Sequence, residues 1–151
     1  MIQALFLLLI ASAMHFIYDF IPYDIIGLIV PIDESIFQHI KLIFYPILFY
    51  YLYIKRWNTI VIVQLVSIVS MLFIYYFYRY ALNIESVPID ILLVGLIFVI
   101  MQYIDTLALQ HNWITSSKIT ILFIMISIFL LGYLTIYPPN LPMFIEGNPI
   151  K

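Results

Sequence analysis

Five long apolar segments constrain what this chain of 151 residues can fold into. They cover positions 2–20, 34–54, 58–80, 87–109 and 115–136. Each is close to the length of roughly 20 residues that an α-helix needs to cross a bilayer. Because a backbone in lipid satisfies its polar groups only within helices or closed barrels, the sequence predicts an all-α integral membrane protein. Its expected architecture is a bundle of five transmembrane helices.

The composition is typical of a protein embedded in a lipid bilayer, and the bilayer is its expected main partner. Hydrophobic residues make up 66% of the chain and charged residues 9%, whereas soluble domains are nearer half apolar and a quarter charged. A net charge of −2 and the lack of a basic tract exclude nucleic acid as a partner. The chain has no cysteine, which removes thiol catalysis, disulfides and cysteine-based metal sites.

The remaining segments connect or close the bundle, so that 1–151 is expected to be a single transmembrane domain. Positions 21–33 are too short, and too broken by two prolines and a glycine, to span; they predict an apolar loop between the first two helices. Positions 137–151 contain four prolines and predict an extended Pro-rich C-terminal tail. No internal repeat is visible, so transport by one five-helix chain is disfavoured, while an oligomer stays open.

The flanking charges give an orientation. The first segment lacks the positive n-region of a signal peptide, so we interpret it as a spanning helix rather than a cleaved leader. An odd number of spans puts the two termini on opposite sides. Lys55, Arg56 and Lys118 flank one side, and the positive-inside rule then favours a cytoplasmic N-terminus and an outside C-terminus. The composition and the absence of a targeting peptide suit a multi-pass protein of a bacterial plasma membrane.

The stretch 31–46, PIDESIFQHIKLIFYP, concentrates ionisable groups at the start of the second span. Asp33, Glu34, His39 and Lys41 fall within nine residues. Asp33 is an acceptable N-cap, and the charge of Glu34 complements the positive end of a helix dipole. The histidine and the lysine would lie deeper, where an unpaired charge costs several kcal/mol and therefore requires partners, snorkelling or a water-filled pocket.

The predicted topology gathers polar residues into one half of the membrane. The first span ends on the same side of the membrane on which the second and fourth spans begin. The polar residues at these three helix ends therefore lie in the same half of the membrane. The candidate ligand-binding pocket comprises His15, Asp19, Glu34, Ser35, Gln38, His39, Lys41 and Asp90. Each residue also has a purely structural interpretation. It could cap a helix, place a charge that complements the helix dipole, or, for His15 and Asp19 one turn apart, form a hydrogen bond within the helix. Together they favour a functional pocket over a purely structural network.

A metal site is one use of this cluster. His15, Asp19, Glu34 and His39 would supply nitrogen and oxygen ligands suited to zinc or a similar divalent ion. The sequence lacks an H-E-x-x-H motif or comparable metal signature, so the interpretation depends on the four residues meeting in space.

The motifs resemble a family of small bacterial membrane proteins, the domain of unknown function number 6512. The family pattern is similar to P-x-N-E-S-x-W-E-H-x-K-L-x-F-x-P, with P-P-x-x-P-x-F near the far end, and this chain has YPPNLPMF at 137–144. The departures are Asp33 for asparagine, Phe37 for tryptophan and Gln38 for a second glutamate. The resemblance implies a fold and a site location over nearly the whole chain, but no reaction.

Three functions therefore stay open. The first is a membrane protein that binds a small molecule, a lipid headgroup or an ion in the polar pocket, the default role of ionisable groups inside a bundle. The second is a metal-assisted, hydrolase-like intramembrane enzyme. The third is a structural or immunity-type partner subunit whose polar residues only hold it together.

Overall fold

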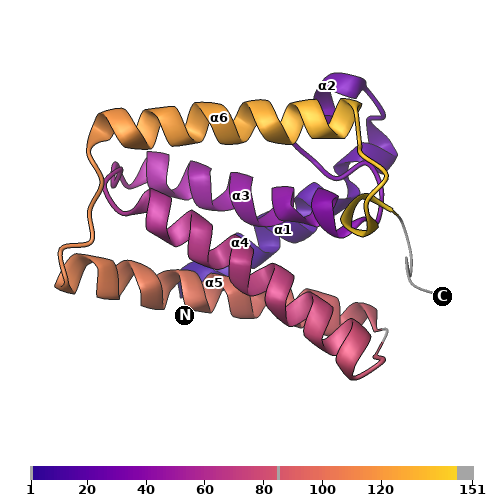
Figure 1. The fold of residues 1–151 in the computed structure, drawn as a ribbon, viewed down its shortest axis with the longest axis horizontal. Helices are drawn as coiled ribbons and strands as arrows, with labels where there is room; N and C mark the ends of the chain where they lie inside the picture. The colour runs from indigo at the N-terminus through magenta and orange to yellow at the C-terminus, as the bar shows by residue number, and fades with distance from the viewer. Residues whose placement is uncertain (1, 85, 146–151) are drawn as a thin grey trace.

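The chain folds into helices throughout the part that the computed structural model describes, residues 2–84 and 86–145. Five long helices form the molecule, and no strand occurs within those ranges (Figure 1). They are α1 (Ile2–Phe20), α3 (Ile36–Tyr53), α4 (Ile60–Tyr76), α5 (Val87–Gln110) and α6 (Ser117–Ile136). Three short elements accompany them: α2 (Asp24–Gly27), the π-helix η1 (Phe77–Ala81) and the 3-10 helix η2 (Pro142–Phe144). The all-α prediction is confirmed.

Among the described residues, four helical segments are long and apolar enough to cross a membrane: Ile2–Phe20, Ile60–Ala81, Pro88–Gln110 and Ser117–Ile136. They fit a membrane protein. The second long helix, α3, is not among them, and it carries Gln38, His39 and Lys41 in its first half. The prediction of five spans therefore stays a prediction.

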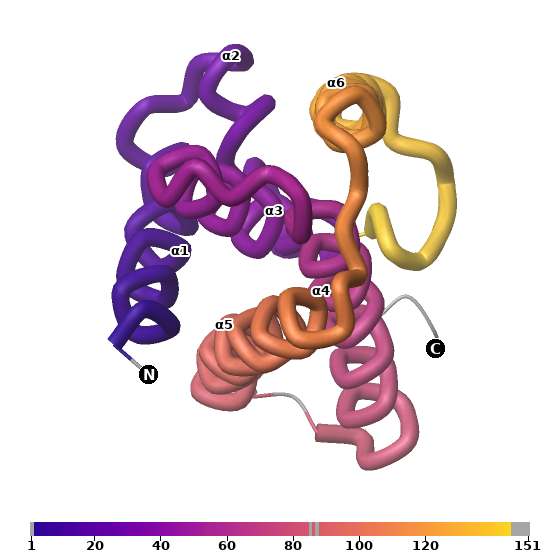
Figure 2. Tube along the Cα trace, turned by 90° about the vertical axis from the view of Figure 1, so that its left-hand side faces the viewer, coloured from indigo at the N-terminus to yellow at the C-terminus, as the bar shows by residue number. Residues whose placement is uncertain are grey.

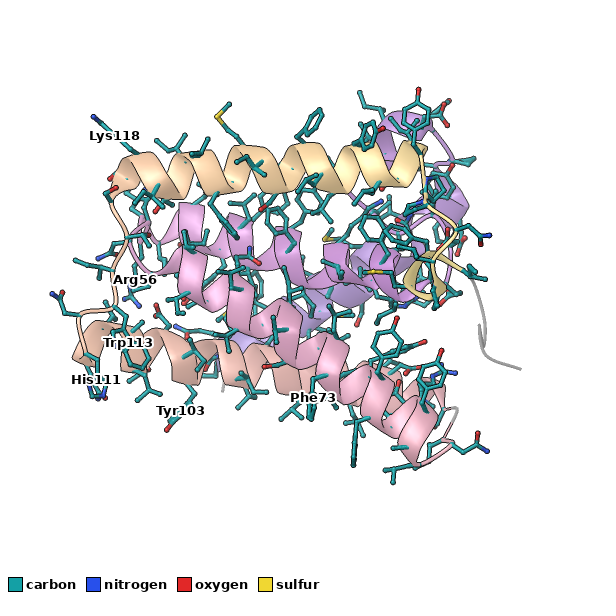
Figure 3. All side chains as sticks on the ribbon, in the orientation of Figure 1. Arg56, Phe73, Tyr103, His111, Trp113 and Lys118 are labelled. Atoms are coloured by element: carbon teal, nitrogen blue, oxygen red, sulfur yellow. The ribbon has the colours of Figure 1, made fainter. Side chains whose placement is uncertain are left out.

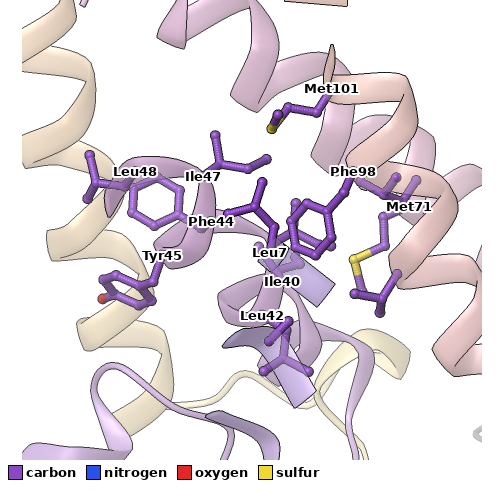
Figure 4. Packing of buried hydrophobic residues seen from close by; sticks show 14 of the residues in the cluster. Leu7, Ile40, Leu42, Phe44, Tyr45, Ile47, Leu48, Met71, Phe98 and Met101 are labelled. Atoms are coloured by element: carbon purple, nitrogen blue, oxygen red, sulfur yellow. The ribbon is translucent and has the colours of Figure 1, made fainter. Parts of the chain in front are cut away.

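Helix α3 forms the centre of the bundle, and most of its residues are buried. It packs against α1, α4 and α5, with α6 along the outer side of the bundle (Figures 1 and 2). In the core, Phe44 and Ile47 of α3 lie among Leu7 of α1, Phe98 of α5 and Met71 of α4 (Figure 4). These large apolar side chains are almost completely enclosed. Because burial of these apolar side chains is favourable, it fixes the position of α3 in the bundle and, with it, the polar residues of its first turns.

The outside of the bundle is apolar, as a lipid-facing surface requires. Phe73 on α4 and Tyr103 on α5 project outward (Figure 3), and α6 buries only Thr120, Leu131 and Thr135. So much exposed apolar surface is unusual for a soluble monomer. It agrees with a protein whose sides face acyl chains.

Polar contacts close the end of the bundle that carries Arg56, Trp113 and Lys118 (Figure 3). Arg56 Nη1 donates to Asp105 Oδ2 at 2.5 Å, and Thr59 Oγ1 donates to Asp105 Oδ1 at 2.6 Å. These bonds tie the connection between α3 and α4 to α5. The buried carboxylate thus has a donor on each oxygen, as a charge in a low-dielectric setting requires.

The connection before α3 differs from the predicted loop in two respects. It contains the single turn α2, and α3 begins at Ile36 rather than at position 34. Ser35, not Asp33, is the N-cap: Ser35 Oγ accepts from the Gln38 backbone N–H at 3.4 Å. Asp33 instead accepts from the Ser35 N–H at 2.8 Å, a local turn that a short acidic side chain favours. The assignment of Asp33 as the cap was wrong because both residues can cap a helix and the sequence does not separate them.

The C-terminal segment folds back on α3. Phe144 in η2 lies against Phe37, with ring centroids 4.4 Å apart. Phe37 and His39 are about 200° apart around the helix axis, so η2 packs on the side of α3 away from that histidine. The last part of the predicted Pro-rich tail, residues 146–151, lies outside the described residues, and an extended tail stays a prediction.

Candidate metal centre

Three predicted site residues converge at one end of the bundle. His15 lies near the end of α1, Glu34 just before α3, and His39 in its first turn. Glu34 Oε2 is 3.6 Å from His15 Nε2 and 3.5 Å from His39 Nε2. One ligand atom from each residue lies within 4.8 Å of the other two. Within the described ranges no other group of three histidines, cysteines or acids has such spacing.

Local structure fixes the orientation of His39. Its Nδ1 lies 2.9 Å from the backbone oxygen of Ser35, one turn earlier. A carbonyl oxygen can only accept, so the hydrogen bond assigns the proton to Nδ1 and leaves the lone pair of the neutral ring on Nε2. Metal-ligating histidines are commonly held in this way, with the second ring N–H on a carbonyl or carboxylate.

The distances at Glu34 fit a shared cation better than a direct hydrogen bond. A carboxylate oxygen and an imidazole lone pair are both acceptors, and N–H···O bonds are shorter, about 2.7–3.2 Å. Ligand atoms bound tetrahedrally to zinc at about 2.0–2.1 Å would lie about 3.3–3.4 Å from one another. The observed 3.5 and 3.6 Å are close to that spacing. The three residues could therefore hold a zinc-like ion with little movement.

The centre is partly exposed at the surface of the bundle. The side chains of His39 and His15 are 18% and 28% exposed, and that of Glu34 is 60% exposed. The two imidazoles meet edge to face with centroids 5.2 Å apart, and Phe16 packs beside His15. The histidines thus sit against the bundle while the carboxylate faces outward, which gives an ion a route in.

The other predicted pocket residues are not among the three possible ligands. Asp19 is exposed and is not in the three-residue group. Gln38 is buried, and its Oε1 has no hydrogen-bond partner in the described structure. Ser35 acts through its cap and its carbonyl. Asp90 accepts from Tyr78 Oη and from Arg79 Nη2, the latter at 3.1 Å.

Lys41 is fully buried and does not snorkel to the interface. Its Nζ donates to the backbone oxygens of Gly27 at 2.5 Å and Val30 at 3.2 Å. Tyr45 Oη donates to the neighbouring Leu28 oxygen at 3.0 Å. We call this contact of Lys41 and Tyr45 with residues 27–30 the loop clasp. Lys41 was predicted as a pocket residue because it lies in the polar half of the second span; a loop folded over it was not visible in the sequence.

Two surface grooves lie elsewhere and contain no predicted site residue. One is lined by Val69, Leu72, Phe73, Tyr76 and Phe77. The other is lined by Trp57, Ser117 and Ile121. A single pocket around all eight predicted residues therefore stays a prediction.

Sequence reasoning missed the partners of Asp90. Tyr78 and Arg79 lie in η1, the π-helix that ends the third long apolar segment. The available signal was an aromatic and basic run, YYFYRY, facing an acidic residue across a short connection. What the sequence did not contain was the π-helical turn, which sets the direction of both side chains.

Comparison with known proteins identifies a family, but no matching curated protein or solved structure. A family model described as "Family of unknown function (DUF6512)" matches residues 1–149 and so includes the centre and the loop clasp. No curated protein matches the chain. No solved structure matches it either. The model covers nearly the whole sequence, and the chain therefore belongs to the DUF6512 family of unknown function.

Proposed function

We propose that this protein is an integral membrane protein that binds a divalent transition-metal ion, zinc first among them, through His15, Glu34 and His39. The observation that carries the proposal is the convergence of two imidazole Nε2 atoms, from separate helices, on one carboxylate oxygen at 3.5 and 3.6 Å. The sequence analysis expected a small molecule, a lipid headgroup or an ion as the ligand, and this proposal takes the ion.

The ligand set supports zinc over the common hard cations. Calcium and magnesium take mostly oxygen ligands, six or more in number. Two imidazoles and one carboxylate are instead typical of zinc and its first-row neighbours. The fixed tautomer of His39 further favours an ion that accepts a nitrogen lone pair.

In the proposed arrangement the chain crosses a bacterial plasma membrane five times, with α3 as the second span. The N-terminus is cytoplasmic and the C-terminus outside, since Lys55, Arg56 and Lys118 gather at one end. The metal centre then lies in the outer half of the membrane. From there it would take its ion from the outer side.

Elemental analysis tests the metal proposal. Protein purified in detergent without chelators is compared with a His15→Ala/His39→Ala double variant. His111→Ala is the matched control, because His111 is exposed at the far end of the bundle and stacks on Trp113. We expect near-stoichiometric zinc in the wild type and the control and none in the double variant. Equal metal in all three, or metal in none, would contradict the proposal.

A further inference from the structure

The candidate metal centre has the ligand count of a catalytic site. Structural zinc sites are usually closed by four protein ligands, whereas catalytic ones have three and keep a position for water or substrate. His15, Glu34 and His39 supply three, and no fourth histidine, cysteine or acid of the described chain joins their group. The carboxylate of Glu34 is 60% exposed, so the centre is open to the surroundings of the bundle on that side. A bound zinc ion would therefore carry a water molecule.

The charge of the centre favours ionisation of that water. A divalent ion with one carboxylate and two neutral imidazoles keeps a net positive charge, and zinc lowers the pKa of its bound water to about 7. Two further carboxylates, Asp33 and Asp90, lie within electrostatic range of the ligand residues. Each is already held by hydrogen-bond donors of its own. A hydroxide on the metal is thus available near neutral pH.

The depth of the centre indicates which molecules could reach it. His15 lies five residues before Phe20, the last residue of an apolar span, which is roughly 7–8 Å along the helix. Because a helix of 19 residues is about as long as the hydrocarbon core is thick, that depth lies within the acyl-chain region, just below the headgroups. Phe16 packs beside His15, and both Phe16 and Phe20 are exposed, apolar and on the outside of α1. A molecule with a polar group at the metal and an acyl chain along α1 would fit this setting.

We propose that the centre hydrolyses a carboxylic ester of an acyl amphiphile at the membrane boundary, an inference that rests on the metal binding proposed above. The metal-bound water first loses a proton to solvent on the open side of Glu34. The resulting hydroxide attacks the ester carbonyl carbon and forms a C–O bond. The bond to the alcohol oxygen then breaks, and that oxygen takes a proton from water. One ester and one water become one carboxylic acid and one alcohol.

A carboxylic ester fits better than a phosphate ester. Many phosphoryl-transfer enzymes use two metal ions about 3.5–4 Å apart to hold the attacking and leaving oxygens. The described residues form a single group able to hold one ion. A single hydroxide with an open position suffices for attack on an acyl carbon.

The test uses the full chain in lipid nanodiscs, stripped with chelator and reloaded with zinc. p-Nitrophenyl octanoate, p-nitrophenyl acetate and p-nitrophenyl phosphate are the substrates. Glu34→Gln and His39→Ala remove ligands, and His111→Ala is the matched control. Cobalt replaces zinc in a parallel sample, because its visible absorption reports a tetrahedral site independently of activity.

We expect zinc to raise octanoate hydrolysis at least about 100-fold over the stripped protein, with kcat/KM for octanoate at least about tenfold above acetate. Both ligand variants should return to the stripped rate, and His111→Ala should not. Stoichiometric zinc and a tetrahedral cobalt spectrum without ester hydrolysis would overturn the hydrolase inference and leave metal binding intact. Faster hydrolysis of the phosphate would also overturn it. Failure to bind zinc or cobalt would overturn both proposals.

Discussion

The Nδ1 atom of His39 donates to the backbone oxygen of Ser35 at 2.9 Å. Through this bond the first turn of α3 fixes both the tautomer and the direction of the ring. The Nε2 lone pair is left facing the carboxylate of Glu34. The helix cap and the proposed metal ligand His39 are therefore one local structure, and changes to the cap should alter binding of the proposed ion.

Replacing Ser35 with alanine should weaken zinc binding without removing a ligand. The variant loses the cap bond to the Gln38 N–H, at a cost of about 1 kcal/mol. Fraying of the first turn then loosens the Ser35 carbonyl that orients His39, and loss of such outer-shell support typically lowers metal affinity about 10–100-fold. Calorimetric zinc titration measures the change.

Ser116→Ala provides the matched control for that experiment. Ser116 caps α6 in the same manner, through a 3.5 Å bond from the Ile119 N–H, and has no part in the metal centre. It should lose similar helix stability and keep wild-type zinc affinity. An equal loss of affinity in both variants would show that the effect is general destabilisation.

Lys41→Met should destabilise the fold. The substitution keeps most of the side-chain volume but leaves the Gly27 and Val30 carbonyls without their donor, at about 1–3 kcal/mol for each buried group. Thermal unfolding in detergent should show a lower midpoint. Tyr45→Phe, which loses one clasp bond, should show a smaller decrease.

Lys118→Met is the control for the loop clasp, because this lysine is exposed at the start of α6. Its midpoint should match the wild type. If Lys41→Met also unfolded at the wild-type temperature, the clasp would contribute nothing to stability.

Asp105→Ala should destabilise the opposite end of the bundle and leave zinc affinity unchanged. It removes the acceptor of both Arg56 and Thr59, whose bonds join the α3–α4 connection to α5. The Arg56 side chain is 41% exposed and regains water, so we expect a loss of about 1–3 kcal/mol rather than the larger cost of a buried pair. Denaturant unfolding and zinc titration on the same sample separate the two effects. Loss of zinc affinity would contradict the assignment of this cluster to a purely structural role.

Zinc affinity should fall steeply in acid. Two imidazoles must be unprotonated to bind zinc. As the pH falls, binding must release up to two protons, so the apparent affinity should fall by up to about 100-fold per pH unit. Zinc titrations between pH 5 and 8 check this. A pH-independent affinity would exclude imidazole ligands.

Single-cysteine labelling tests whether α3 crosses the membrane. The chain has no cysteine, so each introduced thiol is the sole target. Tyr23→Cys and Tyr53→Cys flank α3 and are both well exposed. If α3 spans, an impermeant maleimide applied from one side should label only one of the two. Labelling of both from the same side would contradict a fifth span.

The sequence predicts the five long helices closely, because an apolar run of this length has few other structures available in lipid. The helix ends are less well predicted, as with Ser35 and Asp33, where two capping residues compete. The predicted topology places Glu34 and Lys41 in the same half of the membrane. It does not show that residues 27–30 cover the lysine.

The metal candidates illustrate the same limit. His15 and Asp19 share a face of α1, yet only the histidine joins Glu34 and His39. Their meeting depends on how the connection between α1 and α3 returns the chain, which is a matter of tertiary packing rather than local pattern. Of the four residues that the sequence suggests as metal ligands, the fold brings three close together, and the metal site stays a proposal.

X-ray absorption at the zinc edge of the loaded protein tests the three proposed ligands directly. We expect a first shell of four light atoms at about 2.0–2.1 Å, with outer-shell scattering from two imidazoles that disappears in the His15→Ala/His39→Ala variant. A six-oxygen shell, or imidazole scattering that is unchanged in that variant, would contradict a zinc ion held by His15, Glu34 and His39.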